Sequence, residues 1–396
     1  MSHPFRPSAD PNVDNPLQSE ADPVSSATKN TTSDLHDESS SSDSSTSSAD
    51  SVASVNTLKP GPNEHAARWT NYFTHELNLE HRTDDHASNA GPVTAKYHVY
   101  LTPPTNPQKD PLFICHHGAG ASGLSFAILA REIRRILPTA GILSLEARGH
   151  GSVVTDVQGT TNLVEYSLPT LTSDARTMIT LTSQRMGWHP TLPPIVLVGH
   201  SLGGAIAAQL AADYALGNAL IGFCVIDVVE GSALEALTHM KTYLSSRPSR
   251  FASEDEAIHW HLRTRTIRDR ESAQASVPSL LVHDPSTGDL IWKTDLPATQ
   301  PWWPDWFQGM SAKFLRGRGA KLLVLAGTDR LDRELMIGQM QGKFQLVVVP
   351  EAGHFVQEDV PAKLAGVLVE FFHRNDRSAL VLPPKVSDLL AQGKKV

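Results

Sequence analysis

The chain has 396 residues, 40% of them hydrophobic, and a formal net charge of −8 at pH 7. It is long enough to bury a large core, and it lacks the basic excess that neutralises nucleic-acid phosphates. No apolar run reaches the roughly 18 residues needed to span a bilayer, and the first residues do not resemble a secretory signal.

We therefore expect no nucleic-acid partner and no membrane contact. The chain has two cysteines, Cys115 and Cys224, and each lies inside an apolar run. Both are predicted to be reduced thiols in a buried core, which suits a reducing compartment. The sequence predicts a cytoplasmic or nuclear protein.

The first 59 residues are polar, and eleven of the residues between Thr31 and Asn56 are serines. Such a segment buries too little apolar surface to offset the entropy lost on ordering the chain. We predict a disordered tail over residues 1–59, a folded domain over residues 60–375 and a loosely held segment over residues 376–396.

Between these tails, apolar runs alternate with amphipathic segments, a pattern typical of an α/β sheet with helices on both faces. Helices are predicted over Ser125–Leu137, Leu202–Tyr214 and Ala362–Phe372, each with one apolar face. The predicted strands are Ala95–Leu101, Leu112–His116, Gly141–Glu146, Ile195–Gly199, Leu220–Val228, Lys321–Ala326 and Phe344–Val349.

One interval interrupts this alternation, from about Ser232 to Arg318. It is too long for a simple crossover between two strands, and it includes the tryptophan-rich stretch IWKTDLPATQPWWPDWF. We interpret residues 232–318 as a cap that packs over the carboxyl ends of the strands.

The stretch GHSLG connects the predicted strand ending at Gly199 directly to the helix beginning at Leu202. This is the context of a nucleophile elbow, in which a serine occupies a sharp turn and its neighbours must lack bulk. Gly199 and Gly203 meet that requirement, and the helix directs its free N–H groups at the serine. The motif predicts that Ser201 is a nucleophile.

A serine nucleophile needs a base, and His354 lies in PEAGHF, between the last predicted strand and the C-terminal helix. An acyl-transfer site also needs hydrogen-bond donors for the oxyanion. The turn HHGAGAS supplies candidates in the backbone N–H groups of Ala119 and Gly120, together with that of Leu202.

The histidines of that turn, His116 and His117, do not indicate a metal site. Adjacent side chains project in opposite directions, and no further ligands lie at a suitable spacing. We expect no bound metal.

Two carboxylates compete to orient His354. Asp329 follows the second-last predicted strand, where most α/β-hydrolases carry their acid, and Asp227 ends the strand after the nucleophile helix. Strand position favours Asp329. However, Arg330 and Arg333 lie close enough to hold it in an ion pair, whereas Asp227 must find a partner as its apolar strand is buried. The residues alone leave both open.

Several longer motifs resemble the protein phosphatase methylesterase family, over about residues 60–375. They are GHSLGGAIA, CVIDVVEGSALEAL, IRDRESAQAS, WFQGMSAKFL, and LLVLAGTDRLDRELMIGQMQGKFQ followed by AGHFVQED. The resemblance implies an α/β-hydrolase fold, with a mostly parallel sheet and a cap insertion. It implies a serine esterase that removes the methyl ester from the C-terminal leucine of the type 2A protein phosphatase catalytic subunit.

In that family the acid is the aspartate of IDVVEG, so the resemblance selects Asp227 over Asp329. It also makes Met336–Phe344 and parts of the cap candidates for contact with the phosphatase. Some members carry a long acidic insertion in the cap, whereas the corresponding segment here, Pro278–Leu296, is short and nearly neutral. The resemblance therefore does not carry any function of that insertion over to this chain.

The expected reaction is a two-step acyl transfer through Ser201, Asp227 and His354, which needs no cofactor. Two alternatives share these residues. One is a carboxylesterase for small-molecule or lipid esters, and the other is a phosphatase-binding inhibitor in which catalysis is secondary.

Overall fold

The computed structural model describes residues 69–83, 93–156, 162–327 and 331–376. The predicted tail over residues 1–59, nearly all of the predicted segment 376–396 and the candidate acid Asp329 lie outside these residues. Among the described helices, none is both long and apolar enough to cross a bilayer.

Nine strands of the described chain form one mixed sheet. In sheet order they are β1 (His75–Thr83), β2 (Val93–Thr102), β4 (Gly141–Leu145), β3 (Leu112–His116), β6 (Ile195–His200), β7 (Leu220–Ile226), β11 (Ala320–Leu325) and β12 (Gln345–Val348), while β5 (Val153–Asp156) also pairs with β2.

The strands from β4 to β12 are parallel, whereas β1, β2 and β5 pair antiparallel at one edge. Every residue of β3, β4 and β6 is buried. Parallel strands that are covered on both faces need continuous apolar sequences. For this reason the sequence predicts these strands from apolar runs.

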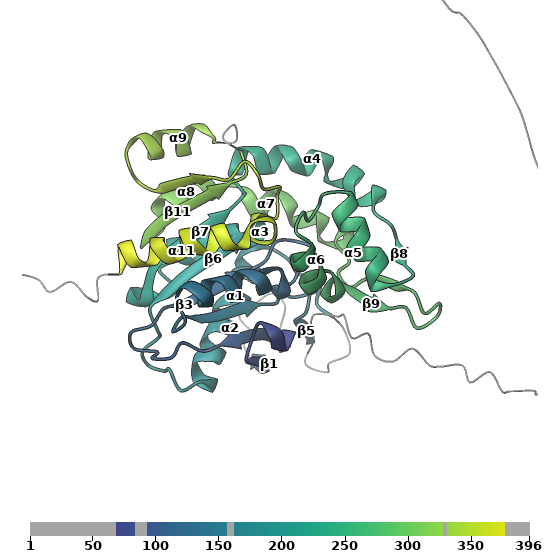
Figure 1. The fold of residues 1–396 in the computed structure, drawn as a ribbon, viewed down its shortest axis with the longest axis horizontal. Helices are drawn as coiled ribbons and strands as arrows, with labels where there is room; N and C mark the ends of the chain where they lie inside the picture. Colours follow the sequence, from purple (N-terminus) through teal and green to yellow (C-terminus); the bar gives the residue numbers. More distant parts are fainter. Residues whose placement is uncertain (1–68, 84–92, 157–161, 328–330, 377–396) are drawn as a thin grey trace, which may run out of the picture. The chain divides into compact units, whose positions relative to one another are not determined.

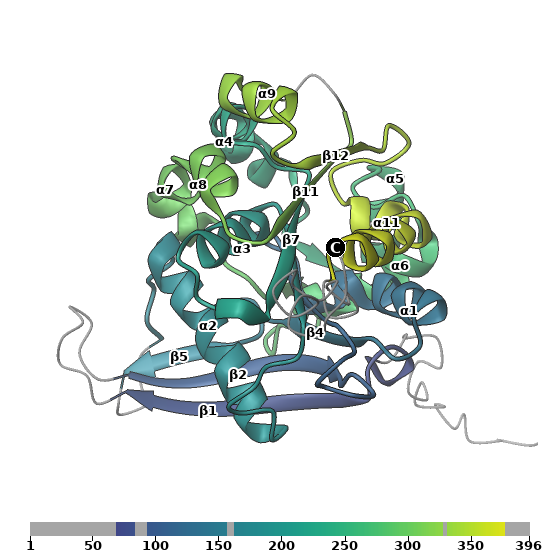
Figure 2. The same ribbon diagram turned by 90° about the vertical axis from the view of Figure 1, so that its left-hand side faces the viewer.

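Helices cover both faces of this sheet. Helices α1 (Ala127–Ile136) and α11 (Pro361–Asn375) lie on one face, and α2 (Leu168–Arg185), α3 (Leu202–Ala212) and α8 (Met310–Arg316) lie on the other (Figure 2). Each face has its own cluster of buried apolar side chains. The sheet therefore separates two cores, and its carboxyl edge is free to carry a site.

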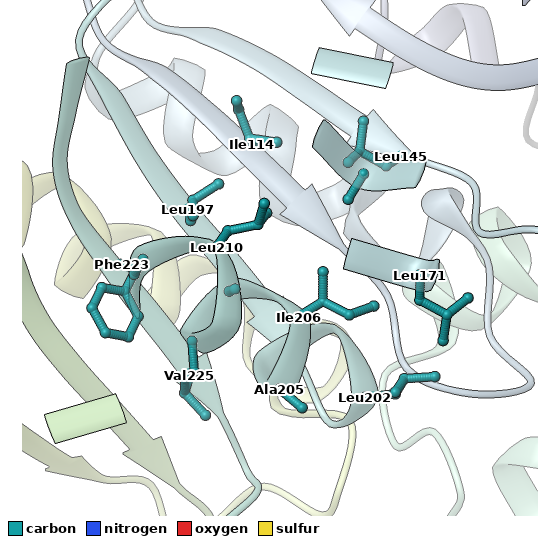
Figure 3. Close-up of a cluster of buried hydrophobic side chains, with 14 of the residues drawn as sticks. Ile114, Leu145, Leu171, Leu197, Leu202, Ala205, Ile206, Leu210, Phe223 and Val225 are labelled. Atoms are coloured by element: carbon teal, nitrogen blue, oxygen red, sulfur yellow. The ribbon is translucent and has the colours of Figure 1, made fainter. Parts of the chain in front are cut away.

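The core under α3 fixes the helix that follows Ser201. Ile206 and Leu210 of α3 lie among Leu197 of β6 and Phe223 and Val225 of β7 (Figure 3). Leu202, the first residue of α3, is buried in the same cluster. The start of the helix is thus held against the sheet by apolar packing.

The cap begins after β7 and contains helices and a small sheet of its own. Figure 1 shows α5, α6, β8 and β9 grouped together. Its elements are α4 (Glu230–Ser246), β8 (Arg250–Phe251), α5 (Glu254–Arg263), α6 (Arg270–Ser276), β9 (Leu281–His283), β10 (Leu290–Trp292), α7 (Trp303–Phe307) and α8, with β10 between β8 and β9.

The tryptophan-rich stretch mainly anchors the cap. Trp303, Trp306 and Phe307 are buried in the main core under α3, and Trp306 Nε1 donates to the Tyr166 carbonyl at 2.7 Å. A separate cluster that includes Phe251, Ile267 and Leu290 holds the outer part of the cap together.

The remaining described helices are α9 (Arg333–Met340) and α10 (Val356–Asp359). Short 3-10 turns cover Trp69–Asn71, Gly123–Phe126, Gly217–Ala219, Val277–Leu280 and Pro297–Trp302.

All seven predicted strands occur, as β2, β3, β4, β6, β7, β11 and β12. The predicted end of β7 was wrong, because the strand stops at Ile226 and Asp227 turns into a positive φ of 48°. The predicted helix over Ser125–Leu137 begins as a 3-10 turn and becomes α-helical only at Ala127. Strands β1 and β5, at the antiparallel edge, were not predicted.

Replacing Phe223 by alanine tests the core under α3. Phe223 is fully buried, so we expect Phe223→Ala to lower the free energy of unfolding by about 3–5 kcal/mol through lost packing and a residual cavity. Urea denaturation of the purified protein measures this. In the control variant Ile136→Ala, a 42% exposed side chain is truncated, and we expect a change within about 0.5 kcal/mol. Equal effects of the two changes would contradict the proposed packing.

Candidate active site

Ser201 occupies a strained turn between β6 and α3. Its φ and ψ are 52° and −119°, a conformation that non-glycine residues rarely adopt and that costs on the order of 1–3 kcal/mol. Hydrogen bonds maintain it: the Ser201 N–H donates to the Ile226 carbonyl at 3.0 Å, and the Ser201 carbonyl accepts from the Gly204 N–H at 2.8 Å. The turn is therefore held from both β7 and α3.

The two glycines of the motif are required by close backbone contacts. A Cβ atom on Gly199 would lie 2.1 Å from the Gly203 carbonyl oxygen, and one on Gly203 would lie 2.0 Å from the His116 carbonyl oxygen. No side chain fits at either position without moving the backbone. The glycines bring the ends of β3 and β6 and the start of α3 into direct contact.

Asp227 and His354 form a hydrogen-bonded pair across the carboxyl edge of the sheet. His354 Nδ1 lies 2.8 Å from Asp227 Oδ2, and the Ala326 N–H donates to Asp227 Oδ1 at 2.9 Å. The Asp227 side chain is fully buried, whereas that of His354 is 47% exposed. Because the carboxylate accepts, the proton of the neutral ring lies on Nδ1, and Nε2 is left with its lone pair.

Ser201 and His354 both line one cavity of about 340 Å³, which the cap covers. Within the described residues, no hydrogen bond joins the Ser201 hydroxyl to the His354 ring; such contacts commonly shorten when substrate binds. Cap residues that line this cavity include Leu237, Arg247, Trp292 and Trp306.

A larger and more open hollow, of about 1000 Å³, lies by the first residue of β7. Among the described residues that line it, none is a serine or a histidine, so we do not consider it further as a site of acyl transfer.

His200, which the sequence reasoning did not single out, connects the serine turn to the His354 loop. Its Nε2–H donates to the His354 carbonyl at 2.9 Å, and the two rings lie 4.6 Å apart between centroids. Burial lowers the pKa of His200 to about 3, so the ring is neutral at physiological pH. Its place inside GHSLG was the only sequence signal for this role.

The loop that carries His354 is also attached to the cap. Asp359 Oδ2 accepts from the Gly353 N–H at 2.6 Å, and its Oδ1 accepts from the N–H of Arg268, a cap residue, at 2.7 Å. Next to it, Glu358 accepts a hydrogen bond from Ser276 of α6. These two carboxyl groups hold the cap and the His354 loop in one arrangement, and neither was identified from the sequence.

The candidate oxyanion donors do not all remain available. The Gly120 N–H donates to His150 Nε2 at 2.8 Å, so in this arrangement it is occupied. Among the residues that the structure describes, the N–H groups of Ala119 and Leu202 form no hydrogen bond. Ala119 and Ser201 line the same cavity.

Buried histidines brace the turn that contains Ala119. His117 Nδ1–H donates to the Gly118 carbonyl at 2.8 Å, and its Nε2 accepts from the Ala147 N–H at 3.0 Å. Burial lowers the pKa of His117 well below its usual value, and that of His150 to about 4. Both rings are therefore neutral, and they act as hydrogen-bonding supports for the turn. Over the described ranges, no group of three or more His, Cys, Asp or Glu residues is arranged to hold a metal ion.

Arg148 holds the loop that supplies His150. Its guanidinium makes two hydrogen bonds to Asp174, of 2.5 and 2.8 Å, and Tyr97 donates to the same carboxylate at 2.7 Å. All three side chains are buried. These contacts make the glycine-rich loop EARGHG a structural support for the neighbouring turn.

Comparison with known proteins adds to this geometry. A model of the alpha/beta hydrolase family matches residues 113–367. Protein phosphatase methylesterase 1 of Neurospora crassa is 52% identical over 396 residues, covering 87% of each chain. The protein of that name from Aspergillus fumigatus is 51% identical over 394 residues, covering 95% of this chain and 88% of its own.

Solved structures are similar at the level of the fold. E-2-(acetamidomethylene)succinate hydrolase superposes with a TM-score of 0.56 at 19% identity, covering 76% of this chain and all of its own. The central sheet and its helices are thus shared with a protein of distant sequence.

The strain at Ser201 can be measured by comparing two variants that both lack the hydroxyl. Glycine tolerates the observed φ and ψ and alanine does not, so we expect Ser201→Gly to be more stable than Ser201→Ala by about 1 kcal/mol, although glycine normally destabilises. Chemical denaturation of the two proteins gives the difference. If Ser201→Ala is as stable as Ser201→Gly, the turn does not store strain.

Proposed function

We propose, because the chain belongs to the protein phosphatase methylesterase family of α/β-hydrolases, that it removes the methyl ester from the C-terminal leucine of the type 2A protein phosphatase catalytic subunit. The predicted fold and family are confirmed, and the chain is a carboxylic ester hydrolase. One observation carries the proposal: His354, which is paired with the buried Asp227, lines the same cavity as the strained Ser201.

In the proposed reaction, His354 Nε2 takes the proton from Ser201 as Oγ attacks the ester carbonyl carbon. The N–H groups of Leu202 and Ala119 donate to the oxyanion, each contributing roughly 10²–10³ to the rate. His354 then gives its proton to the departing methoxide, which leaves as methanol and forms an acyl-serine.

Water completes the second step. His354 removes a proton from water as its oxygen attacks the acyl-serine carbonyl, and returns that proton to Ser201 as the carboxylic acid is released; the acid then loses its remaining proton to solvent. Asp227 stabilises the imidazolium in both steps and keeps the ring oriented. In this scheme His200 is a positioning residue, because it holds the backbone of His354 without touching the substrate.

The cavity suits the end of a peptide chain. Apolar side chains from the cap, Leu237, Met240 and Trp306, line it beside Ser201. A C-terminal leucine is a small apolar group that such a wall accommodates.

The candidate surface for the phosphatase lies on α9. Met336, Ile337 and Met340 are 47%, 45% and 88% exposed on this helix, an unusual concentration of large apolar side chains. We propose that they contact the folded phosphatase while its tail enters the cavity. We also propose a cytoplasmic or nuclear location, supported by the free and buried thiols Cys115 and Cys224.

Substitutions at the candidate acids test the mechanism. We expect Asp227→Asn to reduce kcat for a leucine methyl ester peptide by roughly 10⁴, as loss of the orienting carboxylate does in serine proteases. Asp329→Asn should retain turnover within a few-fold of wild type, and Ser201→Ala should release no methanol above background. Measurement of methanol release decides between the acids: a large loss confined to Asp329→Asn would show that Asp227 has been assigned wrongly.

A charge on α9 tests the partner surface. We expect Met340→Asp to reduce demethylation of the intact phosphatase roughly 10-fold, because an apolar contact would become a buried charge. Hydrolysis of a short methylated peptide should change much less. Ile136→Asp, an exposed position on α1, is the matched control. A similar loss of activity on both substrates would show that Met340→Asp disturbs the cavity or the folding of the protein, and not a partner surface.

A further inference from the structure

Arg247, a cap residue, brings an uncompensated positive charge to the candidate active site. It lines the cavity that contains Ser201 and His354, and it is half-buried. Its guanidinium carbon lies 3.7 Å from the centre of the Trp292 ring. In the part of the chain that the structure describes, no carboxylate forms an ion pair or hydrogen bond with it.

A half-buried guanidinium without a carboxylate is costly. Burial lowers the pKa of Arg247, and the cation–π contact with Trp292 compensates only part of the lost hydration. Its neighbour His261 is neutral, because burial lowers the pKa of that ring to about 4, and its Nδ1–H donates to the Ala257 carbonyl. Among the described residues around Arg247, none forms an ion pair with its guanidinium.

The rest of the cavity wall adds no negative charge. Arg265 is a second cation on the lining. Glu358 is the carboxyl group on the lining; burial raises its pKa well above the usual range, and the hydrogen bond donated by Ser276 offsets only part of that shift. Asp227 does not line the cavity and is paired with His354. In a chain with a net charge of −8, the described lining of this cavity thus carries two arginines and one carboxyl group.

We propose that Arg247 selects substrates by pairing with an anionic side chain upstream of the methylated C-terminal residue. The partner is a carboxylate of Asp or Glu, or a phosphoryl group, because each matches the planar fork of a guanidinium. Trp292 holds the guanidinium plane and leaves its N–H groups for the ligand. This inference rests on the proposed function, and it adds to it a requirement on the sequence of the tail.

Short synthetic peptides that end in leucine methyl ester provide the test. One series carries a single Asp at each of the five positions before the leucine in turn, and matched series carry Asn, phosphoserine, Ser or Lys there. We expect wild type to prefer the anionic peptide at one position by roughly 10-fold in kcat/KM, mainly through KM. The preference should shrink as ionic strength rises.

Variants assign the preference to one side chain. Arg247→Gln keeps a long side chain for packing on Trp292. It should reduce the preference for the anionic peptide to within 2-fold, because the variant lacks the charged hydrogen bond to the peptide. Arg247→Glu should favour the Lys peptide instead. Arg263→Gln, at an exposed position of α5 that does not line the cavity, is the matched control and should keep the wild-type preference. Thermal unfolding checks that each variant is folded.

Peptide binding to Ser201→Ala, measured by calorimetry, separates this inference from the proposed function. Equal affinity for anionic and neutral peptides at every position would overturn the role of Arg247, whether or not wild type releases methanol. Absence of methanol release from every peptide and from the intact phosphatase would instead overturn the proposed function. A preference that survives in Arg247→Gln would also overturn the inference.

Discussion

The backbone contact between the start of α3 and the end of β3 is the constraint on which the site depends. Gly203 lies so close to the His116 carbonyl, and Gly199 so close to Gly203, that a single Cβ atom at either position would force the strands apart. This contact fixes the helix start and the turn before it at the same edge of the sheet. The strain at Ser201 persists because the two apolar cores hold β6, β7 and α3 in place around it.

Hydrogen bonds then attach more distant segments to that fixed point. His200 reaches the His354 carbonyl, His150 occupies the Gly120 N–H, and Asp359 joins Gly353 to a cap residue. Most of these groups are buried, and they are either neutral or paired. They therefore stabilise the positions of the loops and add little charge to the site. The geometry of the candidate site therefore depends on loops from several parts of the chain.

The sequence predicted the centre of the fold better than its edges, for physical reasons. Strands such as Leu112–His116 are buried on both faces, and their composition shows it, whereas β1 mixes charged and apolar residues because it is an edge strand. The two- and three-residue strands of the cap are too short to show a periodicity. Ser201 and His354 were proposed as site residues from local motifs. The choice of Asp227 as the candidate acid needed the family resemblance. The hydrogen bond between His150 and the Gly120 N–H depends on tertiary packing, which no local sequence pattern encodes.

The two arginines on the cavity wall also bear on what happens after the bond is broken. Ester hydrolysis turns an uncharged end group into a carboxylate inside a cavity whose lining carries Arg247 and Arg265. The product is thus more strongly attracted to the site than the substrate was, and its departure exposes an anion to solvent against that attraction. We therefore expect the product acid to leave this cavity more slowly than it would leave an uncharged one.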